Sequence, residues 1–410
     1  MFEVSYGGRA SADGRLTIQR VLIGIVLALL SGTLVVALVR SLSDMPRQPT
    51  IERIAIGLEN PRGVAVLPDG RLLVVEAGNG LDTADPTMET GRVSVLEDLN
   101  QDGDHDDEGE LTPIVSQIAS YNTLTAFGTG HDEVGGAGDV VVLDDGRMFF
   151  TRDDPSDVYV PDGTGAGINV VEVSPEFRLG DNLVVRNATM NAIAHDPETE
   201  LFYIVESGAN RVIDVSMDGT IRTVAELSPL AHGQQAVPSG LTIDPTTGDV
   251  LVALFSGQIS DYFGAVLSYM PGDSKIVRID PTTGAQVDAI PGLTTAVDVA
   301  ADELGNVFVV ELTSSWPPQR MSRDFDLFDP NAAPDAGGYS RFAGSVTLYP
   351  SDGGDPVLLV SGLDSPTNIT YDKGALYVST GQGTPGRSII GPDGLTRITG
   401  EIYRVTDYLP

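Results

Sequence analysis

The chain has 410 residues, with 58 acidic and 24 basic side chains and a formal net charge of −34. A chain this acidic is repelled by nucleic acid and by anionic lipid headgroups, so we expect neither as a partner. It contains no cysteine, which excludes disulfides, thiolate metal sites and cysteine nucleophiles.

The N-terminal part predicts a membrane anchor. Residues 1–20 are polar, and the 19 residues Val21–Val39 carry no charge. This run is long enough to cross a bilayer as a helix, whereas a cleaved signal peptide has a shorter apolar core. We therefore expect a cytoplasmic tail (1–20), a single transmembrane helix (21–40) and a tether (41–50), with the rest of the chain on the periplasmic side of a bacterial inner membrane. Gly24, Ala28 and Gly32 share one helix face, on which another membrane helix can pack.

A hairpin pattern recurs six times after the tether. Its first copy, Gly57–Gly78, has two alternating strands joined by the turn Pro68–Gly70. The other copies are Gly138–Asp154, Asn191–Gly208, Ser239–Gly257, Val297–Ser314 and Thr367–Gly383. Two more strand-like runs follow each hairpin, which predicts an all-β, six-bladed β-propeller over residues 51–410. We expect Ile51–Ile56 to pair with Glu401–Val405 and close the last blade.

Long insertions gather at one end of the predicted strands, so one face of the propeller should carry the loops that bind. The longest insertion, Trp316–Ala343, holds the only Trp together with Arg320, Phe325 and Phe328. These residue types anchor protein interfaces, so we predict a partner-binding surface there. A loop that simply packs over the propeller mouth is the alternative.

An acidic turn is the best candidate metal site. Asn100, Asp102, Asp104 and Asp106 alternate along the turn, as the ligands of a calcium loop do. The turn resembles the first half of an EF-hand loop, but His105 stands where a Gly is expected and Leu111 where the bidentate Glu is expected. We predict a structural Ca²⁺ site, with a solvated acidic turn as the alternative.

The pore ends of the first strands supply a second set of polar residues, Arg62, Asp139, Asn191, Asp298 and Asn368. Propellers of the gluconolactonase and paraoxonase types hold a catalytic calcium at this place, and hydrogen-bonded blade edges are the alternative. Three glutamates that end second strands, Glu76, Glu206 and Glu311, predict salt bridges between blades, with Arg152 in a fourth blade. His131 lies near the place where quinone-dependent sugar dehydrogenases carry a catalytic His, although its spacing is too long.

The hairpin motifs at residues 60–80, 236–257 and 294–314 are similar to those of the ScyD/ScyE family, exported bacterial six-bladed propellers named from scytonemin biosynthesis clusters. The likeness covers residues 50–405, and its motifs are shared with NHL and strictosidine-synthase-like propellers. It implies the fold and export, and it brings no catalytic set. Many members are secreted without an anchor and carry cysteines, so this chain departs from them on both points.

These features favour a non-enzymatic accessory or scaffold subunit of a bacterial membrane complex, respiratory or photosynthetic. The partner would be reached through the membrane helix and the propeller loops. Two alternatives stay open. One is an exported calcium-dependent hydrolase or lactonase of the gluconolactonase type, and the other is a quinone-dependent sugar dehydrogenase.

Overall fold

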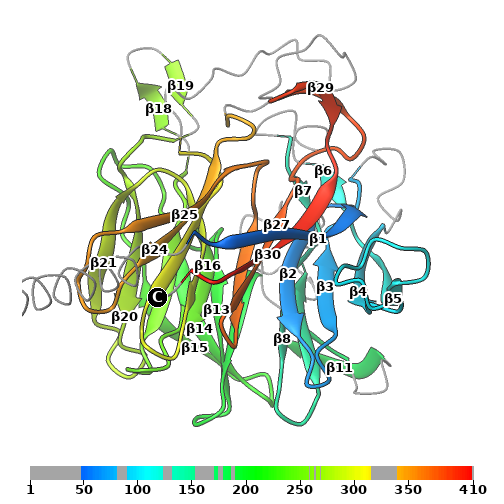
Figure 1. The fold of residues 1–410 in the computed structure, drawn as a ribbon. Coiled ribbons are helices and arrows are strands. Elements are labelled where there is room, and N and C mark those ends of the chain that lie inside the picture. Colours follow the sequence, from blue (N-terminus) through cyan, green and yellow to red (C-terminus); the bar gives the residue numbers. More distant parts are fainter. Residues whose placement is uncertain are drawn as a thin grey trace, which may run out of the picture. The chain divides into compact units, whose positions relative to one another are not determined.

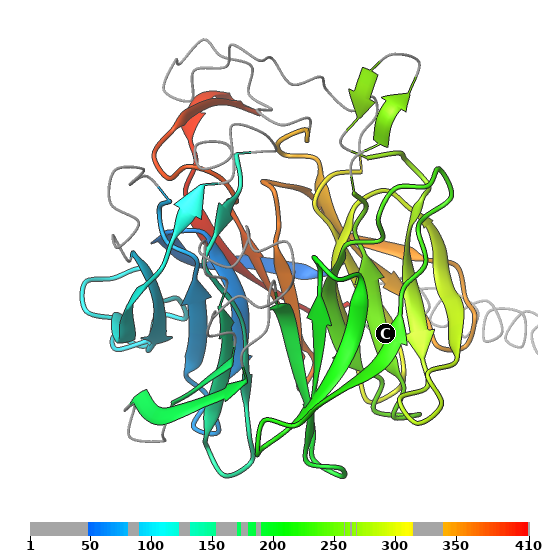
Figure 2. The same ribbon diagram turned by 180° about the vertical axis from the view of Figure 1, so that it is seen from behind.

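Six antiparallel sheets of four strands surround a central axis, which confirms the prediction of an all-β, six-bladed propeller (Figures 1 and 2). The computed structural model describes residues 48–80, 90–122, 132–152, 170–173, 179–185, 190–257, 259–262, 265–267, 269–314 and 339–408. Pro49–Thr406 forms one unit by its internal contacts. Within the described ranges, no helix is long and apolar enough to span a bilayer, and the predicted membrane helix lies outside them.

The blades follow one another along the chain, and each runs from an inner strand to an outer strand. Blade 1 is β2 (Pro61–Val66), β3 (Leu72–Glu76), β4 (Gly91–Leu96) and β5 (Leu111–Ile118). Blade 2 is β8 (Ala137–Val142), β9 (Met148–Arg152), β10 (Val170–Val173) and β11 (Leu179–Val185). Blade 3 is β12 (Met190–Asp196), β13 (Leu201–Glu206), β14 (Arg211–Ser216) and β15 (Ile221–Glu226).

The second half of the chain repeats this order. Blade 4 is β16 (Pro238–Ile243), β17 (Val250–Leu254), β20 (Ser274–Ile279) and β21 (Gln286–Leu293). Blade 5 is β22 (Ala296–Ala301), β23 (Val307–Glu311), β24 (Gly344–Tyr349) and β25 (Val357–Leu363). Blade 6 is β26 (Asn368–Asp372), β27 (Ala375–Thr380), β30 (Gly400–Thr406) and, from the other end of the propeller, β1 (Thr50–Leu58).

In blades 1 and 2, an Asp-Gly pair sets the first turn. Gly70 has a φ of +92°, a conformation that other residues rarely adopt, and its N–H donates to the Leu67 carbonyl at 2.8 Å. The Asp69 carboxylate accepts from the Arg71 N–H at 3.2 Å. Gly146 repeats this geometry in blade 2, where its N–H donates to Leu143. The sequence pattern Asp-Gly-Arg therefore fixes the register of both hairpins.

Apolar side chains fill the space between neighbouring blades, so the core is divided among the blade interfaces. Between blades 2 and 3, the rings of Phe149 and Phe202 lie 4.7 Å apart and both are fully buried. Between blades 5 and 6, Phe308 stacks on Tyr371 at 6.1 Å. The inner strands are covered by neighbours on both sides, and this packing holds their starting residues in a fixed ring.

Closure by the N-terminal strand is confirmed. β1 pairs antiparallel with β30, and Ile51 lies opposite Val405. Three small hairpins rise from one side of the propeller in both views (Figures 1 and 2). They are β6 (Tyr121–Asn122) with β7 (Val134–Gly135), β18 (Ile259–Tyr262) with β19 (Ala265–Leu267), and β28 (Ser388–Gly391) with β29 (Gly394–Arg397). We call this side the loop face, and its position agrees with the predicted loop lengths.

Candidate functional site

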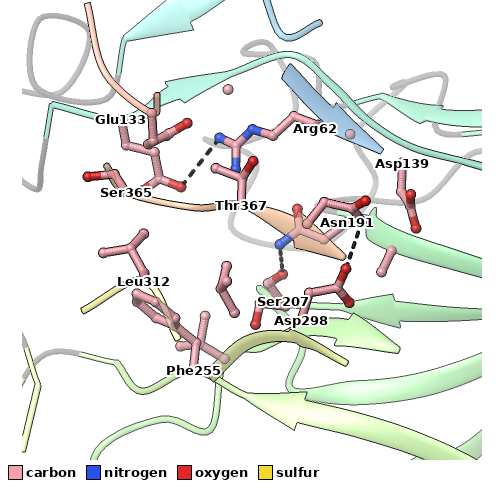
Figure 3. A pocket seen from close by; sticks show the side chains of 18 of the residues that line it. Arg62, Glu133, Asp139, Asn191, Ser207, Phe255, Asp298, Leu312, Ser365 and Thr367 are labelled. Carbon is pink, nitrogen blue, oxygen red and sulfur yellow. Dashed lines mark hydrogen bonds and ion pairs between the residues drawn. The ribbon is translucent and has the colours of Figure 1, made fainter. Parts of the chain in front are cut away.

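A cavity of about 370 Å³ lies on the loop face, where the innermost strands begin (Figure 3). We call it the mouth cavity. All six blades contribute to its wall, through Arg62 (β2), Asp139 (β8), Asn191 (β12), Ser239 (β16), Asp298 (β22) and Asn368 (β26). Ligand pockets in proteins typically have volumes of about 300–1,000 Å³, so a small organic molecule fits.

All five residues predicted to line the pore, Arg62, Asp139, Asn191, Asp298 and Asn368, line the mouth cavity. Three of them, Asp139, Asp298 and Asn368, also line a second cavity of about 350 Å³ between the inner strands. These three side chains therefore form part of the wall between the two cavities.

Asp139 joins blade 2 to blade 3. Its carboxylate accepts hydrogen bonds from the N–H of the next residue, Val140, at 2.9 Å and from the Ile193 N–H at 3.0 Å. These bonds favour the charged form, but enclosure by protein opposes it more strongly. Burial therefore raises the pKa of Asp139 from 3.8 to about 6.

Asp298 makes the corresponding link between blades 5 and 6. Its carboxyl group accepts from the Val299 N–H at 2.8 Å, the Ile369 N–H at 2.9 Å and the Asn368 side-chain amide at 2.7 Å. It is only 3% exposed. Burial, reinforced by the negative charge of Asp139, raises the pKa of Asp298 well above its usual value. Asp298 thus joins two blades through the three N–H groups that donate to its carboxyl oxygens.

Each of these aspartates faces a glycine of the preceding blade. A Cβ atom on Gly63 would lie 2.3 Å from Asp139 Oδ1, and one on Gly240 would lie 2.1 Å from Asp298 Oδ1. No other residue fits there without a shift of the backbone. The contact between blades 1 and 2 is thus repeated between blades 4 and 5, a two-fold pattern in the inner ring that sequence reasoning missed. In both pairs the first strand of one blade begins with Pro-x-Gly, and the first strand of the next blade contains Asp-Val.

Two buried ion pairs build one wall of the mouth cavity. Asp132 accepts from Arg387 Nε at 2.8 Å and from both the hydroxyl and the N–H of Thr384. Arg341 donates to both carboxylate oxygens of Asp364, each at 2.6 Å. Every one of these ionic groups except Asp364 is less than 7% exposed, and Asp364 is 11% exposed. Sequence reasoning did not single out either pair.

Arg62 brings a positive charge to the mouth cavity. Its guanidinium donates to the Val134 carbonyl at 2.7 Å and lies 3.9 Å from the Glu133 carboxylate (Figure 3). Nearby, the Asn191 amide donates to the Ser207 hydroxyl. The arginine is 19% exposed, so its charge remains accessible from the cavity.

Another part of the cavity lining is apolar. Phe255, Leu312 and Tyr339 line it, and the rings of Phe255 and Tyr339 lie 5.6 Å apart. Tyr339 is held in place by a parallel stack on Tyr269 at 5.5 Å. Burial raises the pKa of Tyr339 well above its usual value, so this ring stays neutral. These side chains offer apolar contact surface to a ligand.

Gln382 lines the cavity, and its side-chain amide has no hydrogen-bond partner in the described part of the chain. It is 5% exposed, and both polar atoms of its side-chain amide are buried without a hydrogen-bond partner. Leaving a buried polar group unpaired costs about 1–3 kcal/mol. Both atoms have almost no accessible surface, so the amide is enclosed by protein and is not presented to a ligand in the cavity.

Comparison with known proteins decides the family. A family model described as "SMP-30/Gluconolactonase/LRE-like region" matches residues 48–297, more than half of the 410-residue chain. The chain belongs to this family. We refer to it below as the SGL family. The narrower ScyD/ScyE resemblance stays a prediction, and no match is found among curated proteins.

Solved structures share the fold at low sequence identity. A protein of unknown function from Bacteroides thetaiotaomicron is 11% identical, with a TM-score of 0.50 over 88% of this chain and 76% of that one. Virginiamycin B lyase from Staphylococcus aureus is 12% identical, with a TM-score of 0.43 over 88% and 99%. The PQQ-bound aldose sugar dehydrogenase from Streptomyces coelicolor is 14% identical, with a TM-score of 0.47 over 88% and 99%.

The inner ring does not fit the calcium site expected of a gluconolactonase-type propeller. The carboxylates of Asp139 and Asp298 are turned to backbone N–H groups, and the Asn368 carbonyl oxygen accepts from the Val64 N–H at 3.3 Å. Arg62 adds a positive charge to the same ring. Across the described part of the chain, no three His, Cys, Asp or Glu side chains are placed to hold a metal ion.

The acidic turn is ordered by hydrogen bonds of its own. The Asn100 amide donates to Asp102 at 2.9 Å and to Asp107 at 2.5 Å. Asp104 accepts from the Asp106 N–H at 3.2 Å. Repulsion from Asp104 raises the pKa of Asp106. A structural calcium ion at Asn100, Asp102, Asp104 and Asp106 stays a prediction.

The predicted salt bridges between blades are wrong for two of the three glutamates. Glu76 pairs with Arg92, and Glu206 pairs with Arg211, each on the next strand of its own blade. Glu311 accepts from the Thr294 N–H at 2.7 Å. The second strand of a blade lies one strand away from the pore. The side chain at its end is therefore closer to the adjacent strand of its own sheet than to another blade.

Several predicted sites fall outside the described residues. These are the helix face Gly24, Ala28 and Gly32, the loop residues Trp316, Arg320, Phe325 and Phe328, and His131.

Proposed function

We propose that this protein is a hydrolase that opens a small cyclic ester in the mouth cavity, with Asp139 as the base that activates water. One observation carries the proposal: a carboxyl group with a pKa raised to about 6 lies on the wall of a ligand-sized cavity. A pKa near the working pH is what a general base needs. Membership in the SGL family, whose description includes gluconolactonase, supports a cyclic ester as the substrate class.

The reaction balances with groups of this chain and one water molecule. Ionised Asp139 takes a proton from water while the water oxygen adds to the ester carbonyl carbon. The Arg62 guanidinium supplies positive charge for the oxyanion that forms. The ring carbon–oxygen bond then breaks, and protonated Asp139 returns its proton to the leaving alkoxide. The product is an open-chain hydroxy acid.

Asp298 provides the contrast to Asp139. Both aspartates accept backbone N–H groups of the next blade, but the pKa of Asp298 is raised well above its usual value while that of Asp139 is raised to about 6. Asp298 also accepts the Asn368 side-chain amide at 2.7 Å, a bond that Asp139 lacks within the described residues. Asp298 therefore keeps its structural role and leaves the base to Asp139.

The test uses matched asparagine variants and two lactones, D-glucono-1,5-lactone and γ-butyrolactone. Asp139→Asn removes the base, and we expect kcat/KM for lactone hydrolysis to fall by about 10²–10⁴. Asp298→Asn changes a carboxyl group of the same ring that takes no part in the proposed reaction, so we expect kcat/KM within about threefold of the wild type and an unchanged circular dichroism spectrum. Hydrolysis of neither lactone by the wild type, or equal activity of Asp139→Asn and wild type, would refute the proposal.

The accessory-subunit role predicted from the sequence is the second candidate, and one observation favours it. The hairpin β28–β29 pairs Ile390 with Leu395 on the loop face, and these side chains are 57% and 68% exposed. An exposed apolar pair on a projecting hairpin suits contact with another protein. A stoichiometric partner in native mass measurements after gentle detergent extraction would support this role, and a lone monomer would count against it. The quinone-dependent dehydrogenase stays a prediction, because His131 lies outside the described residues.

A further inference from the structure

We infer that the cyclic ester bound in the mouth cavity carries an apolar chain, so that the substrate is an alkyl-substituted lactone and not a sugar lactone. The inference rests on the proposed function for the ester ring, and it adds the substituent. Four apolar side chains in the cavity lining carry it: Val237, Phe255, Leu312 and Tyr339. We call them the apolar patch.

The apolar patch and the reacting groups come from different halves of the propeller. Phe255 directly follows β17 of blade 4 and Leu312 directly follows β23 of blade 5, whereas Arg62 lies in blade 1 and Asp139 in blade 2. The first strands of successive blades contact one another all the way round the ring, so blades 4 and 5 face blades 1 and 2 across its axis. Figure 3 shows Phe255 and Leu312 apart from Arg62 and Asp139. A ligand whose ester group lies at Arg62 and Asp139 can therefore extend a substituent to the apolar patch.

The backbone of the apolar patch is held in conformations that its residues rarely adopt. Val237 has a φ of +48° and Ser256, which follows Phe255, has a φ of +121°. A positive φ is especially unfavourable for a β-branched residue such as valine. The Val237 N–H donates to the Asn210 side-chain carbonyl at 2.9 Å, and the Val237 carbonyl accepts from the Phe255 N–H at 3.0 Å. These bonds fix Val237 beside Phe255, and strained backbone of this kind is concentrated at binding and catalytic sites.

A ligand can reach the apolar patch. Val237, Phe255 and Tyr339 are partly exposed, and Leu312 is 8% exposed. The Leu312 N–H donates to the Thr295 carbonyl at 3.0 Å, which fixes the backbone of Leu312. The patch is therefore a preformed surface for a small apolar group.

The polar groups nearest to the patch in the sequence are already used within the protein. Ser239 and Ser256 line the cavity from blade 4, and their hydroxyl groups donate to the carbonyls of Ala296 at 3.3 Å and of Gly257 at 3.1 Å. A sugar hydroxyl placed against the apolar patch would lose its water and gain no partner from the patch, which lowers affinity by about tenfold. A methylene group placed there raises affinity by about fourfold when it leaves water. Alkyl chains are therefore favoured over sugar hydroxyls.

Three five-membered lactones test the inference, because they differ only in what the ring carries. γ-Butyrolactone carries no substituent, γ-octalactone carries a butyl group, and D-ribono-1,4-lactone carries hydroxyl groups. We measure kcat/KM for each. Cyclopentanone and 3-butylcyclopentanone, in which a methylene group replaces the ring oxygen, cannot be hydrolysed. Protein-observed NMR titration of these two ketones gives Kd and thus tests the same preference without turnover.

The chain offers a matched pair of variants. Leu312→Asn places an amide in the apolar patch. Leu304→Asn makes the same change in the same blade, in the turn between β22 and β23, where Leu304 is 67% exposed. Phe255→Asn is the second patch variant, and its side chain is partly exposed, so it serves if Leu312→Asn fails to fold. Urea unfolding establishes that each variant is folded.

We expect the wild type and Leu304→Asn to prefer γ-octalactone over γ-butyrolactone by about tenfold or more in kcat/KM, with D-ribono-1,4-lactone the poorest substrate. They should prefer 3-butylcyclopentanone over cyclopentanone in the same way. Leu312→Asn and Phe255→Asn should each reduce both preferences to less than about threefold. Equal use of the butyl and unsubstituted rings by the wild type, a preference for D-ribono-1,4-lactone, or a butyl preference that survives in the patch variants would overturn the inference. A patch-dependent preference between the ketones without hydrolysis of any lactone would refute the proposed function and leave the apolar patch as the binding surface for the chain.

Discussion

Asp139 is a carboxyl group whose ionisation is opposed by its place in the fold. The inner-ring position that lets it accept the Ile193 N–H also removes it from bulk water. Its pKa is therefore raised to about 6, whereas the pKa of Asp69, in an exposed turn, is lowered by the bond from Arg71. The same residue type thus has opposite shifts because one site is enclosed and the other is solvated and paired.

The raised pKa of Asp139 predicts a pH-dependent stability. The folded state binds this proton more tightly than the unfolded state, whose pKa is near 3.8, so the contribution is present below about pH 4 and is lost as pH rises through 6. The Asp139→Asn variant has no such carboxyl group, so its stability does not fall in this way as the pH rises. We expect the free energy of unfolding of the variant, relative to that of the wild type and measured by urea unfolding, to rise by on the order of 2 kcal/mol between pH 4.5 and pH 7.5.

Asp69→Asn is the control for this prediction, because its carboxylate lies in an exposed turn. It should show no gain relative to the wild type as the pH rises. A difference between Asp139→Asn and wild type that is the same at both pH values would show that the Asp139 carboxyl group is not held near a pKa of 6.

Sequence reasoning placed Asp139 and Asp298 at the pore because strand starts follow from the hairpin pattern. It could not assign their roles. The contacts with Gly63 and Gly240 depend on how closely neighbouring blades approach, and the hairpin pattern of a single blade holds no such information. The unpaired amide of Gln382 was missed for a similar reason, since pairing depends on the whole cavity wall.

At the scale of elements, the wall of the mouth cavity depends on contacts between loops that are distant in sequence. Asp132 precedes β7, and Arg387 lies between β27 and β28, 255 positions further along the chain. The Asn122 amide adds a fourth donor to Asp132 at 2.8 Å. The sequence predicted that long loops share one face, but which of their charges meet depends on the folded loop conformations.

The Asp132–Arg387 pair should stabilise the fold strongly because both partners are buried. Asp132→Ala leaves the guanidinium, which is 4% exposed, without its carboxylate. We expect urea unfolding to show a loss of about 3–5 kcal/mol. Glu52→Gln, which breaks the exposed pair of Glu52 with Arg404, should cost less than about 1 kcal/mol. Similar losses in the two variants would show that the Asp132 pair is solvated.

At the scale of the whole molecule, one strand from the start of the propeller completes its last blade. β1 joins β30 and thereby covers the edge that blade 6 would otherwise expose. This closure could be predicted from the sequence. Alternating apolar residues predict a strand at each end of the propeller sequence, and pairing these two strands with each other completes the sixth sheet. Because β1 leads directly into β2, the same stretch of chain links the last blade to the first.

Closure predicts that one side chain of β1 controls the stability of the propeller. Ile54 is 1% exposed and packs with Val64 and Val74 of blade 1. Ile54→Ala should cost about 2–5 kcal/mol. Ile56, two residues further along, is 39% exposed, so Ile56→Ala should cost less than about 1 kcal/mol. Urea unfolding, followed by circular dichroism, measures the stability of both variants. If closure stabilises the ring as a whole, Ile54→Ala lowers the global midpoint in a single transition. A separate early transition confined to β1, with the main midpoint unchanged, would show that the ring holds without its closing strand.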